Sequence, residues 1–549
     1  MTSVPPFSGA DALARGAIES GVSLVTGYPG APTTAVVNLI LELTAPDEVQ
    51  VEWTSNEKVA MEVAFGASAG GMRALLCVKS VGLNIALDPL MALNLTGCNA
   101  GLVILVGDDP GGWGSQNEQD SRALALAPEI PLLDPTSVSD ARMAMRQAFR
   151  LSEETCLPVI VRITRALVLA EEVGLAAEEI QAAPPPSLRR EFMRRVVLPI
   201  NVVPYHRRLL HRLDEVQARF EDSPLNGIEG DGPYSRGVIA AGFTYQKLTD
   251  LLDGTVPPGL CILRLGTFHP LPANRITAFL QTLESVLVLE EINPLVERAV
   301  RSIAQQAGLI LPIYGRDTDH VPRAGELFAP HIADALNHFL PSLALPVEGE
   351  TERSRPSRQP LCDDCPYVPT FDALTEVMEQ LGGRDGFIVV GDPGCMVRAQ
   401  LPPYDLMDVK SSLGSSIGMA AGVALSQSKS GMGKRVVALC GDSGFLHSGF
   451  NGLVDAVRVG ATMLVLILDN GTTALSGGQP HPASQADARG KPRGAVNLAL
   501  LARQAGAGEV CVVDLDRGDD IQTAIEARMS FDGVTVIVAR GQCPRYTLY

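Results

Sequence analysis

Two polar clusters in the last third of the sequence each follow an apolar run directly. They are Gly441-Asp442-Ser443 and Asp469-Asn470. Because the carboxyl ends of adjacent parallel strands meet at one sheet edge, we expect Asp442 and Asn470 to lie close together. Carboxylate and amide oxygens suit a hard cation, and magnesium fits best. A diphosphate is its usual companion, which Gly441 would allow to approach closely and the following helix would hold at its N-terminus.

A plainer interpretation is that Asp442 and Asp469 cap the elements that follow them. However, Gly-Asp-Ser followed about thirty residues later by Asn resembles the thiamine diphosphate motif, which favours the metal and diphosphate site. The resemblance implies that the side chains of Asp442 and Asn470 and the backbone carbonyl of Thr472 hold magnesium.

A thiamine enzyme also needs a carboxylate against the aminopyrimidine ring of the cofactor, usually from another domain. Glu57 begins a predicted helix after a short strand. Taken alone, Glu57 would be interpreted as a first-turn residue favoured by the helix dipole. With a diphosphate half-site elsewhere in the chain, it becomes the leading candidate for this catalytic carboxylate.

Short β-branched runs alternate with amphipathic helical stretches along nearly the whole chain, which is typical of βαβ units and parallel sheets. A Pro-rich, basic segment at 184–204 and a polar linker at 348–360 interrupt this pattern. We therefore predict an α/β fold with three parallel-sheet domains, at residues 1–190, 191–347 and 361–549.

Several further motifs occur in order along the chain. They are Gly27-Tyr28-Pro29-Gly30, Glu52-Trp53 with Asn56-Glu57-Lys58, Val81-Gly82-Leu83-Asn84, Asp108-Asp109-Pro110-Gly111 and Ser115-Gln116-Asn117-Glu118-Gln119-Asp120. With the module from Gly441 to Asn470, the whole chain resembles the large subunits of indolepyruvate ferredoxin oxidoreductases, in the 2-oxoacid ferredoxin oxidoreductase superfamily. The resemblance implies three transketolase-like domains: pyrimidine-binding, transketolase C-terminal-like and diphosphate-binding. Its implied cofactor contacts are Tyr28, Pro29, Gly30, Glu57, Gly441, Asp442, Ser443, Asn470 and Thr472.

His447 lies one turn beyond Asp442, near the predicted diphosphate. We count it as a candidate cofactor contact, although a histidine on the helix surface explains the position equally well.

Four cysteines form a second constellation: Cys362 and Cys365 in a CxxC motif, Cys395, and Cys543. Thiolates at such spacings can enclose a 4Fe-4S cluster, and diphosphate-binding subunits of the superfamily resemble this order of cysteines. A zinc site with the same thiolates, or unpaired cysteines that merely pack, are the alternatives. Packing is the interpretation for the cysteines in apolar runs or a helix, namely Cys77, Cys98, Cys261, Cys440 and Cys511.

The sequence departs from the family pattern in three places. The usual pattern continues into a ferredoxin-like domain with two Cys-rich motifs, whereas this sequence ends at Tyr549. A Thr is replaced by Ala31, which removes a hydroxyl expected near the reacting carbon, and a His is replaced by Ser80. The departures leave substrate and reaction outcome open.

The resemblance implies thiamine diphosphate-dependent oxidative decarboxylation of a 2-oxoacid, by default an aryl pyruvate such as indolepyruvate. Coenzyme A would take the acyl group, and the cluster would pass electrons to ferredoxin or a similar carrier. A smaller gamma-type (beta) subunit and a homodimer of heterodimers are expected. A non-oxidative decarboxylase or carboligase is the alternative, favoured by the three departures. A catalytically silent scaffold is a further alternative, against which Glu57, Asp442 and Asn470 argue.

The composition and charge of the chain restrict the partners and the cellular location that we expect. The 549 residues carry 44 Lys and Arg against 62 Asp and Glu, a net charge of −18, and no Lys/Arg cluster is long enough to form a basic face, so nucleic-acid and anionic-membrane partners are not expected. Residues 1–10 do not resemble a secretory signal, and the longest apolar run, 463–468, is far shorter than the roughly 20 residues that span a bilayer. We therefore expect a cytoplasmic protein, whose ten cysteines are not a disulfide framework.

Overall fold

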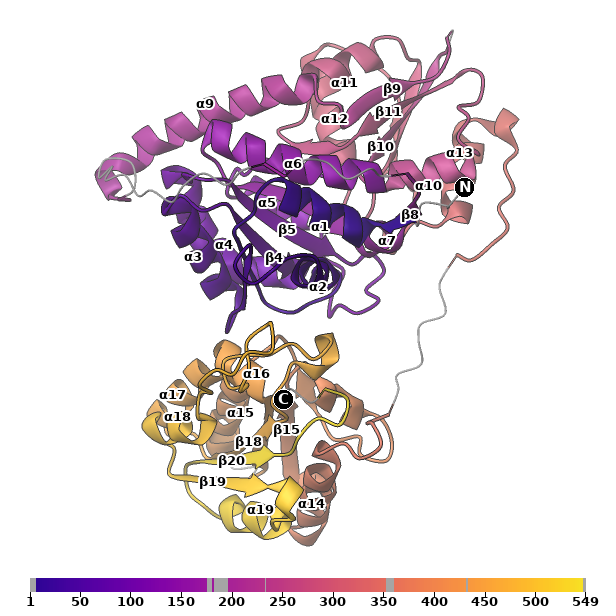
Figure 1. The fold of residues 1–549 in the computed structure, drawn as a ribbon. Coiled ribbons are helices and arrows are strands. Elements are labelled where there is room, and N and C mark those ends of the chain that lie inside the picture. The colour runs from indigo at the N-terminus through magenta and orange to yellow at the C-terminus, as the bar shows by residue number, and fades with distance from the viewer. Residues whose placement is uncertain are drawn as a thin grey trace, which may run out of the picture. The chain divides into compact units, whose positions relative to one another are not determined.

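The computed structural model describes residues 6–174, 180–181, 196–232, 234–351, 360–430 and 433–546. The predicted interruption at 184–204 and linker at 348–360 fall partly outside these residues, as does the boundary between residues 190 and 191. The chain divides into two compact units, Met1–Glu52 with Glu57–Arg355 and Trp53–Asn56 with Pro356–Tyr549. Figure 1 shows the elements of each unit.

The first unit begins with a mostly parallel sheet covered by helices. In spatial order its strands are β12 (Thr267–His269), β6 (Leu132–Leu133), β7 (Val159–Thr164), β5 (Leu102–Asp108), β4 (Ala74–Lys79), β2 (Leu24–Gly27) and β3 (Gln50–Trp53). The helices are α1 (Gly9–Glu19), α2 (Thr33–Leu43), α3 (Glu57–Ala69), α4 (Ser80–Thr96), α5 (Ser121–Leu126), α6 (Val138–Thr155) and α7 (Arg165–Leu169). Strands β1 (Phe7–Ser8) and β8 (Glu171–Glu172) pair separately. The central strands β4, β5 and β7 of the first sheet are buried almost throughout, because apolar side chains cover both faces of that sheet.

A second sheet in the same unit has the order β14 (Ile313–Tyr314), β13 (Ser285–Leu289), β10 (Arg236–Ala241), β11 (Leu260–Leu265) and β9 (Asn226–Glu229). Its helices are α9 (Val202–Glu221), α10 (Thr244–Leu251), α11 (Ala273–Leu280), α12 (Leu295–Gln306) and α13 (Ala329–Phe339), with the short η1 (Pro199–Asn201) and η2 (Pro341–Leu343). All its strand pairs are parallel except β9 with β11.

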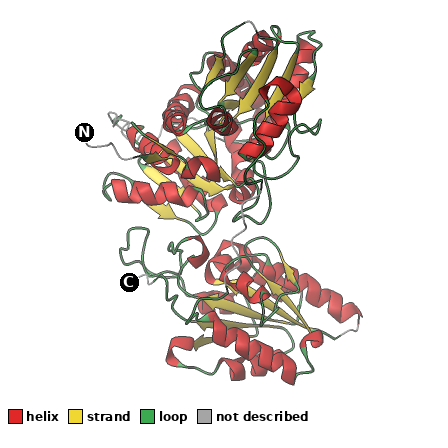
Figure 2. Cartoon of the chain, turned by 90° about the vertical axis from the view of Figure 1, so that its right-hand side faces the viewer, coloured by secondary structure: helices red, strands yellow, loops and turns green. Residues whose placement is uncertain are grey.

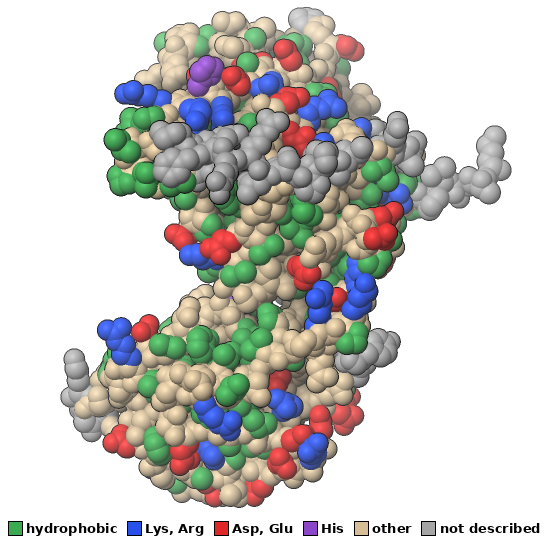
Figure 3. Space-filling model, turned by 60° about the vertical axis from the view of Figure 1, so that its left-hand side comes forward, with side chains coloured by type: hydrophobic (Ala, Val, Ile, Leu, Met, Phe, Trp, Pro, Cys, Tyr) green, Lys and Arg blue, Asp and Glu red, His purple; other side chains and the backbone are tan. Residues whose placement is uncertain are grey.

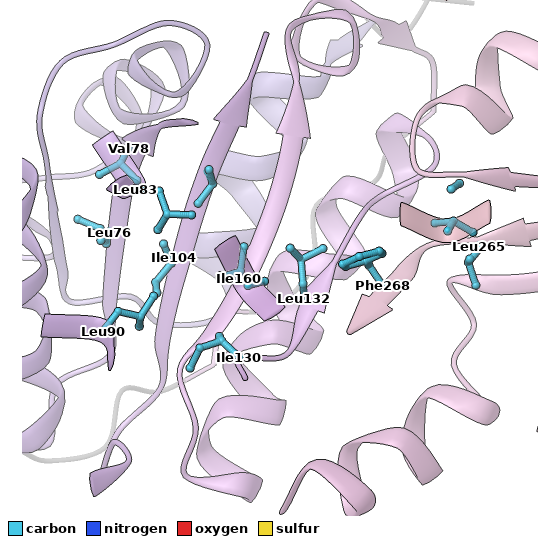
Figure 4. Packing of buried hydrophobic residues seen from close by; sticks show 14 of the residues in the cluster. Leu76, Val78, Leu83, Leu90, Ile104, Ile130, Leu132, Ile160, Leu265 and Phe268 are labelled. Atoms are coloured by element: carbon cyan, nitrogen blue, oxygen red, sulfur yellow. The ribbon is translucent and has the colours of Figure 1, made fainter. Parts of the chain in front are cut away.

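The two sheets of the first unit share one hydrophobic core. Strand β12 pairs antiparallel with β6 and so joins the first sheet, although it directly follows β11 of the second. Leu132 and Ile160 of the first sheet lie beside Phe268 of β12, and Leu265 of β11 belongs to the same cluster of buried residues (Figure 4). The first two predicted domains are therefore packed together.

Buried ion pairs lie within the first sheet and between the two sheets of the first unit. Arg162 contacts Asp108 at 2.7 Å and Asp134 at 3.0 Å, and Arg122 contacts Glu290 at 2.9 Å. All five side chains are nearly inaccessible to solvent. Because removal of one partner would leave a buried charge unpaired, a single loss costs about 3 to 5 kcal/mol. The Arg122–Glu290 pair fixes the start of α5 against the second sheet, whereas the Arg162 pairs hold neighbouring strands of the first sheet together.

The second unit is a doubly covered, entirely parallel sheet. Its spatial order is β16 (Val409–Lys410), β15 (Phe387–Gly391), β17 (Arg435–Gly441), β18 (Met463–Asp469), β20 (Val534–Arg540) and β19 (Glu509–Asp514). The α-helices are α14 (Tyr367–Gln380), α15 (Ser416–Ser430), α16 (Asp442–Gly444), α17 (Phe450–Arg458), α18 (Leu498–Gln504) and α19 (Ile521–Met529). The shorter turns are η3 (Arg384–Gly386), η4 (Cys395–Gln400), the π-helical η5 (Phe445–Gly449), η6 (Ala474–Ser476) and η7 (Leu515–Arg517).

Alternating side chains of this sheet fill two separate cores. Val437 and Leu439 point to the side of α14 and α19, whereas Ala438 and Cys440 point to the side of α15 and α17. Helices accordingly lie on both faces of the sheet (Figure 2). The predicted α/β class with parallel sheets is confirmed.

Basic and acidic side chains are interspersed on the face drawn in Figure 3. None of the described helices is both long enough and apolar enough to cross a bilayer.

Candidate functional site

The two polar clusters predicted to meet do so at the carboxyl edge of the sheet in the second unit. Strands β17 and β18 are parallel neighbours, with Gly441 opposite Leu468. Asp442 therefore begins α16 beside the end of β18, after which Asn470 follows. Because both strands are buried over nearly their whole length, the sheet fixes where these two side chains lie.

Backbone N–H groups hold the carboxylate of Asp442, which is 2% exposed. Ser443 donates to Oδ1 at 2.7 Å, and Asn470 and Gly471 donate to Oδ2 at 3.1 and 2.9 Å. The N–H of Thr472 donates to Oδ1 of Asn470 at 3.2 Å. A carboxylate offers about four acceptor positions and an amide oxygen two, so these bonds leave capacity for a cation. The buried oxygens of Asp442, Asn470 and Thr472 thus fit a magnesium site.

His481 faces the same carboxylate and was not predicted. Its Nε2 lies 3.1 Å from Oδ2 of Asp442, which is ion-pair distance when the imidazole is protonated. The N–H of Ala483 donates to Nδ1 at 3.3 Å. Burial lowers the pKa of His481, but the carboxylates of Asp442 and Asp469 raise it by more. The imidazole therefore pairs with Asp442, one of the predicted metal ligands.

The loop after β18 folds back on itself and carries His481 to this position. The hydroxyls of Thr472 and Thr473 donate to the carbonyl of Gln479 at 3.1 and 2.8 Å. Ser484 donates to the carbonyl of Gly471 at 2.6 Å. No sequence motif marks the histidine, because only this return of the loop brings it to the strand end.

Asp392 packs against Gly444, directly after the Gly441-Asp442-Ser443 loop. It follows β15, is fully buried, and accepts N–H groups of Gly414 at 2.8 Å and Ser416 at 2.9 Å. A Cβ at Gly444 would lie 2.8 Å from its Oδ2, so the close approach requires glycine there. Burial raises the pKa of Asp392 to about 6.

This pKa predicts a pH dependence of stability. Because the folded-state pKa lies above the ordinary 3.8, the folded protein binds a proton that the unfolded chain releases, and stability falls as pH rises between these values. From pH 5 to pH 7, wild type should lose about 1 kcal/mol of unfolding free energy relative to Asp392→Asn. Urea unfolding at both pH values measures this. Equal changes in the two proteins would contradict a raised pKa.

His447 is buried rather than on the helix surface. It lies in the π-helical turn η5, and its Nδ1 is 3.2 Å from Oγ of Ser448. Such turns are frequent at functional sites. Its contact with the diphosphate, like that of Ser443, stays a prediction.

The loop Tyr28-Pro29-Gly30 lies in the first unit, after β2. The N–H of Gly30 donates to Oγ1 of Thr34 at 2.7 Å, and the hydroxyl of Thr33 donates to the carbonyl of Gly30 at 3.0 Å. Tyr28 is buried. The first turn of α2 therefore fixes this loop at the carboxyl edge of the first sheet.

Glu57 begins α3 as predicted, and it is only 6% exposed. Its carboxylate lies against the first turn of α4, where a Cβ on Gly82 would be 2.6 Å from Oε1. Any larger residue at position 82 would displace the carboxylate. The neighbouring motifs therefore combine to hold a buried carboxylate in one place.

The four predicted cluster cysteines line one cavity of about 130 Å³ in the second unit. They are Cys362, Cys365, Cys395 and Cys543. Nη1 of Arg398 lies 3.7 Å from Sγ of Cys362. Burial raises the pKa of Cys395 to about 11, although Arg398 acts in the opposite direction. With this pKa the Cys395 side chain is a neutral thiol at pH 7 unless a cation in the cavity stabilises its thiolate.

Among the described residues, no group of three or more His, Cys, Asp or Glu is arranged to hold a single metal ion. The predicted magnesium site has one carboxylate only. The thiolates of one zinc site all lie about 2.3 Å from the same ion. The thiolates of a 4Fe-4S cluster bind different iron atoms, so they are further apart from one another.

Tyr367 lies between the cysteines and the carboxyl edge. Its hydroxyl donates to the carbonyl of Leu468 at 3.2 Å. The same tyrosine lines the cavity of the four cysteines. Burial raises its pKa, and so do the charges of Asp442 and Cys395. Asn470 also lines the cysteine cavity. The predicted metal site and the four cysteines are therefore neighbours.

Cys77, Cys98, Cys261 and Cys440 are buried, as expected for packing cysteines. Cys511 is half-buried, and so is Cys156, which carried no prediction.

Comparison with known proteins identifies the family. The family model described as pyruvate flavodoxin/ferredoxin oxidoreductase, thiamine diP-binding, matches residues 15–210. The model for the thiamine pyrophosphate enzyme C-terminal TPP binding domain matches residues 392–539. Indolepyruvate oxidoreductase subunit IorA of Pyrococcus abyssi is 34% identical over 568 residues, covering 98% of this chain and 86% of the relative. The chain belongs to the IorA family.

A second IorA relative, from Methanothermobacter thermautotrophicus, is 32% identical over 538 residues, covering 97% of this chain and 86% of its own. Among solved structures, a 2-oxoglutarate:ferredoxin oxidoreductase from Magnetococcus marinus, with 2-oxoglutarate, coenzyme A and succinyl-CoA bound, is 18% identical. The match covers 57% of this chain and 62% of that chain, with a TM-score of 0.48.

The family recognised from sequence is thus confirmed for this IorA-family chain. Both matched models describe thiamine diphosphate-binding domains, so thiamine diphosphate is its cofactor. One matched range includes Glu57, and the other includes Asp442 and Asn470.

Proposed function

We propose that this IorA-family chain is the thiamine diphosphate-binding subunit of a 2-oxoacid:ferredoxin oxidoreductase. It would convert an aryl pyruvate such as indolepyruvate to an acyl-CoA and pass electrons to ferredoxin or a similar carrier. The main support is the proximity of the Asp442 edge and the four-cysteine cavity, with Tyr367 between them. The names of the relatives support the substrate class.

Asp442 and Asn470 would hold magnesium through their side chains and Thr472 through its carbonyl, with Gly441 and Ser443 beside the diphosphate. His481 would stabilise the Asp442 carboxylate through its contact with Oδ2. Thiamine diphosphate supplies the electron sink that loss of carbon dioxide requires. Glu57 would hold a proton against the pyrimidine ring, for which its burial and fixed position suit it.

We further propose that the four cysteines hold a 4Fe-4S cluster, which supplies single-electron transfer. Because this cluster would lie beside the cofactor, it could receive electrons without a large conformational change. The guanidinium of Arg398 would offset the negative charge of the thiolates.

Replacing Cys365 with serine should remove most of the iron, because a hydroxyl is a poor substitute for a thiolate ligand. Cys511→Ser, which changes a half-buried cysteine outside the cavity, is the matched control and should keep wild-type iron. Iron and sulfide are measured in protein purified without oxygen. Full iron in Cys365→Ser would exclude the proposed cluster.

The assembly we propose contains a smaller gamma-type (beta) subunit, in a homodimer of heterodimers. The relatives are named as subunits, which supports a second kind of chain. Coenzyme A as co-substrate and a cytoplasmic location belong to the same proposal.

Anaerobic assay of the two-subunit complex tests the function. Indolepyruvate and coenzyme A together should drive reduction of methyl viologen and yield an acyl-CoA. Carbon dioxide release with an aldehyde product and no viologen reduction would instead show a non-oxidative decarboxylase.

A further inference from the structure

Lys79 is a basic side chain at the edge of the first sheet that carries the cofactor loops. It is the last residue of β4 and pairs with Gly107 near the end of β5. A Cβ at Gly30 would lie 3.1 Å from Cβ of Lys79, so its stem packs against the Tyr28-Pro29-Gly30 loop. The residue therefore stands beside a predicted cofactor contact.

The ammonium of Lys79 has unused capacity. Nζ donates to the carbonyl of Gly114 at 2.8 Å, which uses one of three N–H groups. In the part of the chain that the structure describes, it forms no ion pair within 4.0 Å. Burial lowers the pKa of Lys79, and the more distant Asp109 only partly offsets this. A half-buried cation without a contacting counter-ion is a favourable place for an anion.

Asp109 holds the loop that orients Lys79. Its Oδ2 accepts the N–H of Gly114 at 2.8 Å and the hydroxyl of Ser115 at 2.7 Å. These bonds fix the carbonyl of Gly114, to which the ammonium donates. Oδ2 of Asp109 thus orders the segment, whereas its Oδ1 is buried without a hydrogen-bond partner among the described residues and acts on Lys79 only through its charge.

Helix α4 adds to the positive potential. Lys79 is its N-cap residue, and its side chain does not cap the helix. The first N–H groups of a helix of 17 residues carry partial positive charge at this end. Gly82, in the same first turn, contacts the carboxylate of Glu57. The cation and the predicted catalytic carboxylate thus both flank the first turn of α4.

We propose that Lys79 binds the carboxylate of the 2-oxoacid and so selects for an anionic substrate. This inference rests on the proposed function. The diphosphate of the cofactor is assigned to the Asp442 edge of the other unit. Of the remaining anions, the substrate carboxylate is the one that reacts at the cofactor beside Glu57, and coenzyme A is the alternative that the test distinguishes. The residue is a substrate-binding group, separate from the proton-handling role of Glu57.

The test compares two ligands that lack the reactive ketone, 3-phenylpropanoate and its neutral amide. They are titrated into the thiamine diphosphate-loaded complex. Wild type should bind the carboxylate about 10- to 100-fold more tightly than the amide, as expected for one charged hydrogen bond. Lys79→Met should bind the two equally, Lys79→Arg should retain most of the preference, and Lys434→Met, at an exposed lysine, should behave as wild type.

Thiamine diphosphate and coenzyme A are titrated into the same proteins, and both should bind Lys79→Met normally. A wild type without carboxylate preference, or a preference that survives in Lys79→Met, overturns the inference. If the complex never oxidises a 2-oxoacid but Lys79→Met still loses the preference, the anion site stands and the proposed function fails. If the complex does oxidise a 2-oxoacid but Lys79→Met keeps the carboxylate preference, the proposed function stands and the anion site at Lys79 fails.

Discussion

Replacing Glu57 with glutamine should lower turnover of the 2-oxoacid by at least about 100-fold, since positioned acid–base groups contribute 10² to 10⁴. Glutamine keeps the shape that fits against Gly82 but cannot exchange a proton. Thiamine diphosphate affinity should change only a few-fold, because the diphosphate is held at the other predicted half-site. Turnover numbers and cofactor titration of the same preparation separate these two effects.

Glu62→Gln is the matched control, since Glu62 is exposed on the same helix α3. It should retain wild-type turnover and melting temperature. Normal turnover in Glu57→Gln would refute the assigned role, whatever its effect on stability.

Asp442→Asn should weaken thiamine diphosphate binding in the presence of magnesium by at least about 100-fold. Two backbone N–H groups converge on Oδ2 of Asp442, and an amide nitrogen at that position would face donors instead of an acceptor. Hydrogen bonds to a charged group contribute about 1.5 to 3 kcal/mol each, and the metal loses a carboxylate ligand as well. Calorimetric titration with the magnesium cofactor measures the loss.

Asp455→Asn, on the exposed side of α17, makes the same chemical change away from the site and should bind the cofactor normally. The melting temperature of Asp442→Asn shows whether the variant is folded. A folded variant with wild-type affinity would remove Asp442 from the metal site.

The residues at the carboxyl edge of the second unit were predictable because their positions depend only on the strands that directly precede them. A polar residue that follows a buried strand must lie at the strand's end, so Asp442 and Asn470 could be placed together from two apolar runs. Glu57 was predictable for a similar reason, since it begins a helix inside a distinctive motif.

His481 and Asp392 could not be found in this way. His481 reaches Asp442 through a loop that folds back, and Asp392 contacts Gly414 through a turn with positive φ. Neither contact has a signature in the hydrophobic pattern, because both depend on tertiary packing. The shared core of the first two sheets was missed too, since β12 is too short to show a periodicity.

The content of iron, acid-labile sulfide and thiamine diphosphate in the complex purified without oxygen tests the central claim most directly. The claim is that the diphosphate half-site for thiamine diphosphate and a four-cysteine cluster lie side by side in the second unit of this chain. It predicts one thiamine diphosphate and about four irons with matching sulfide for each IorA-family chain. Protein that retains thiamine diphosphate and magnesium but contains no iron, or contains zinc instead, would contradict it.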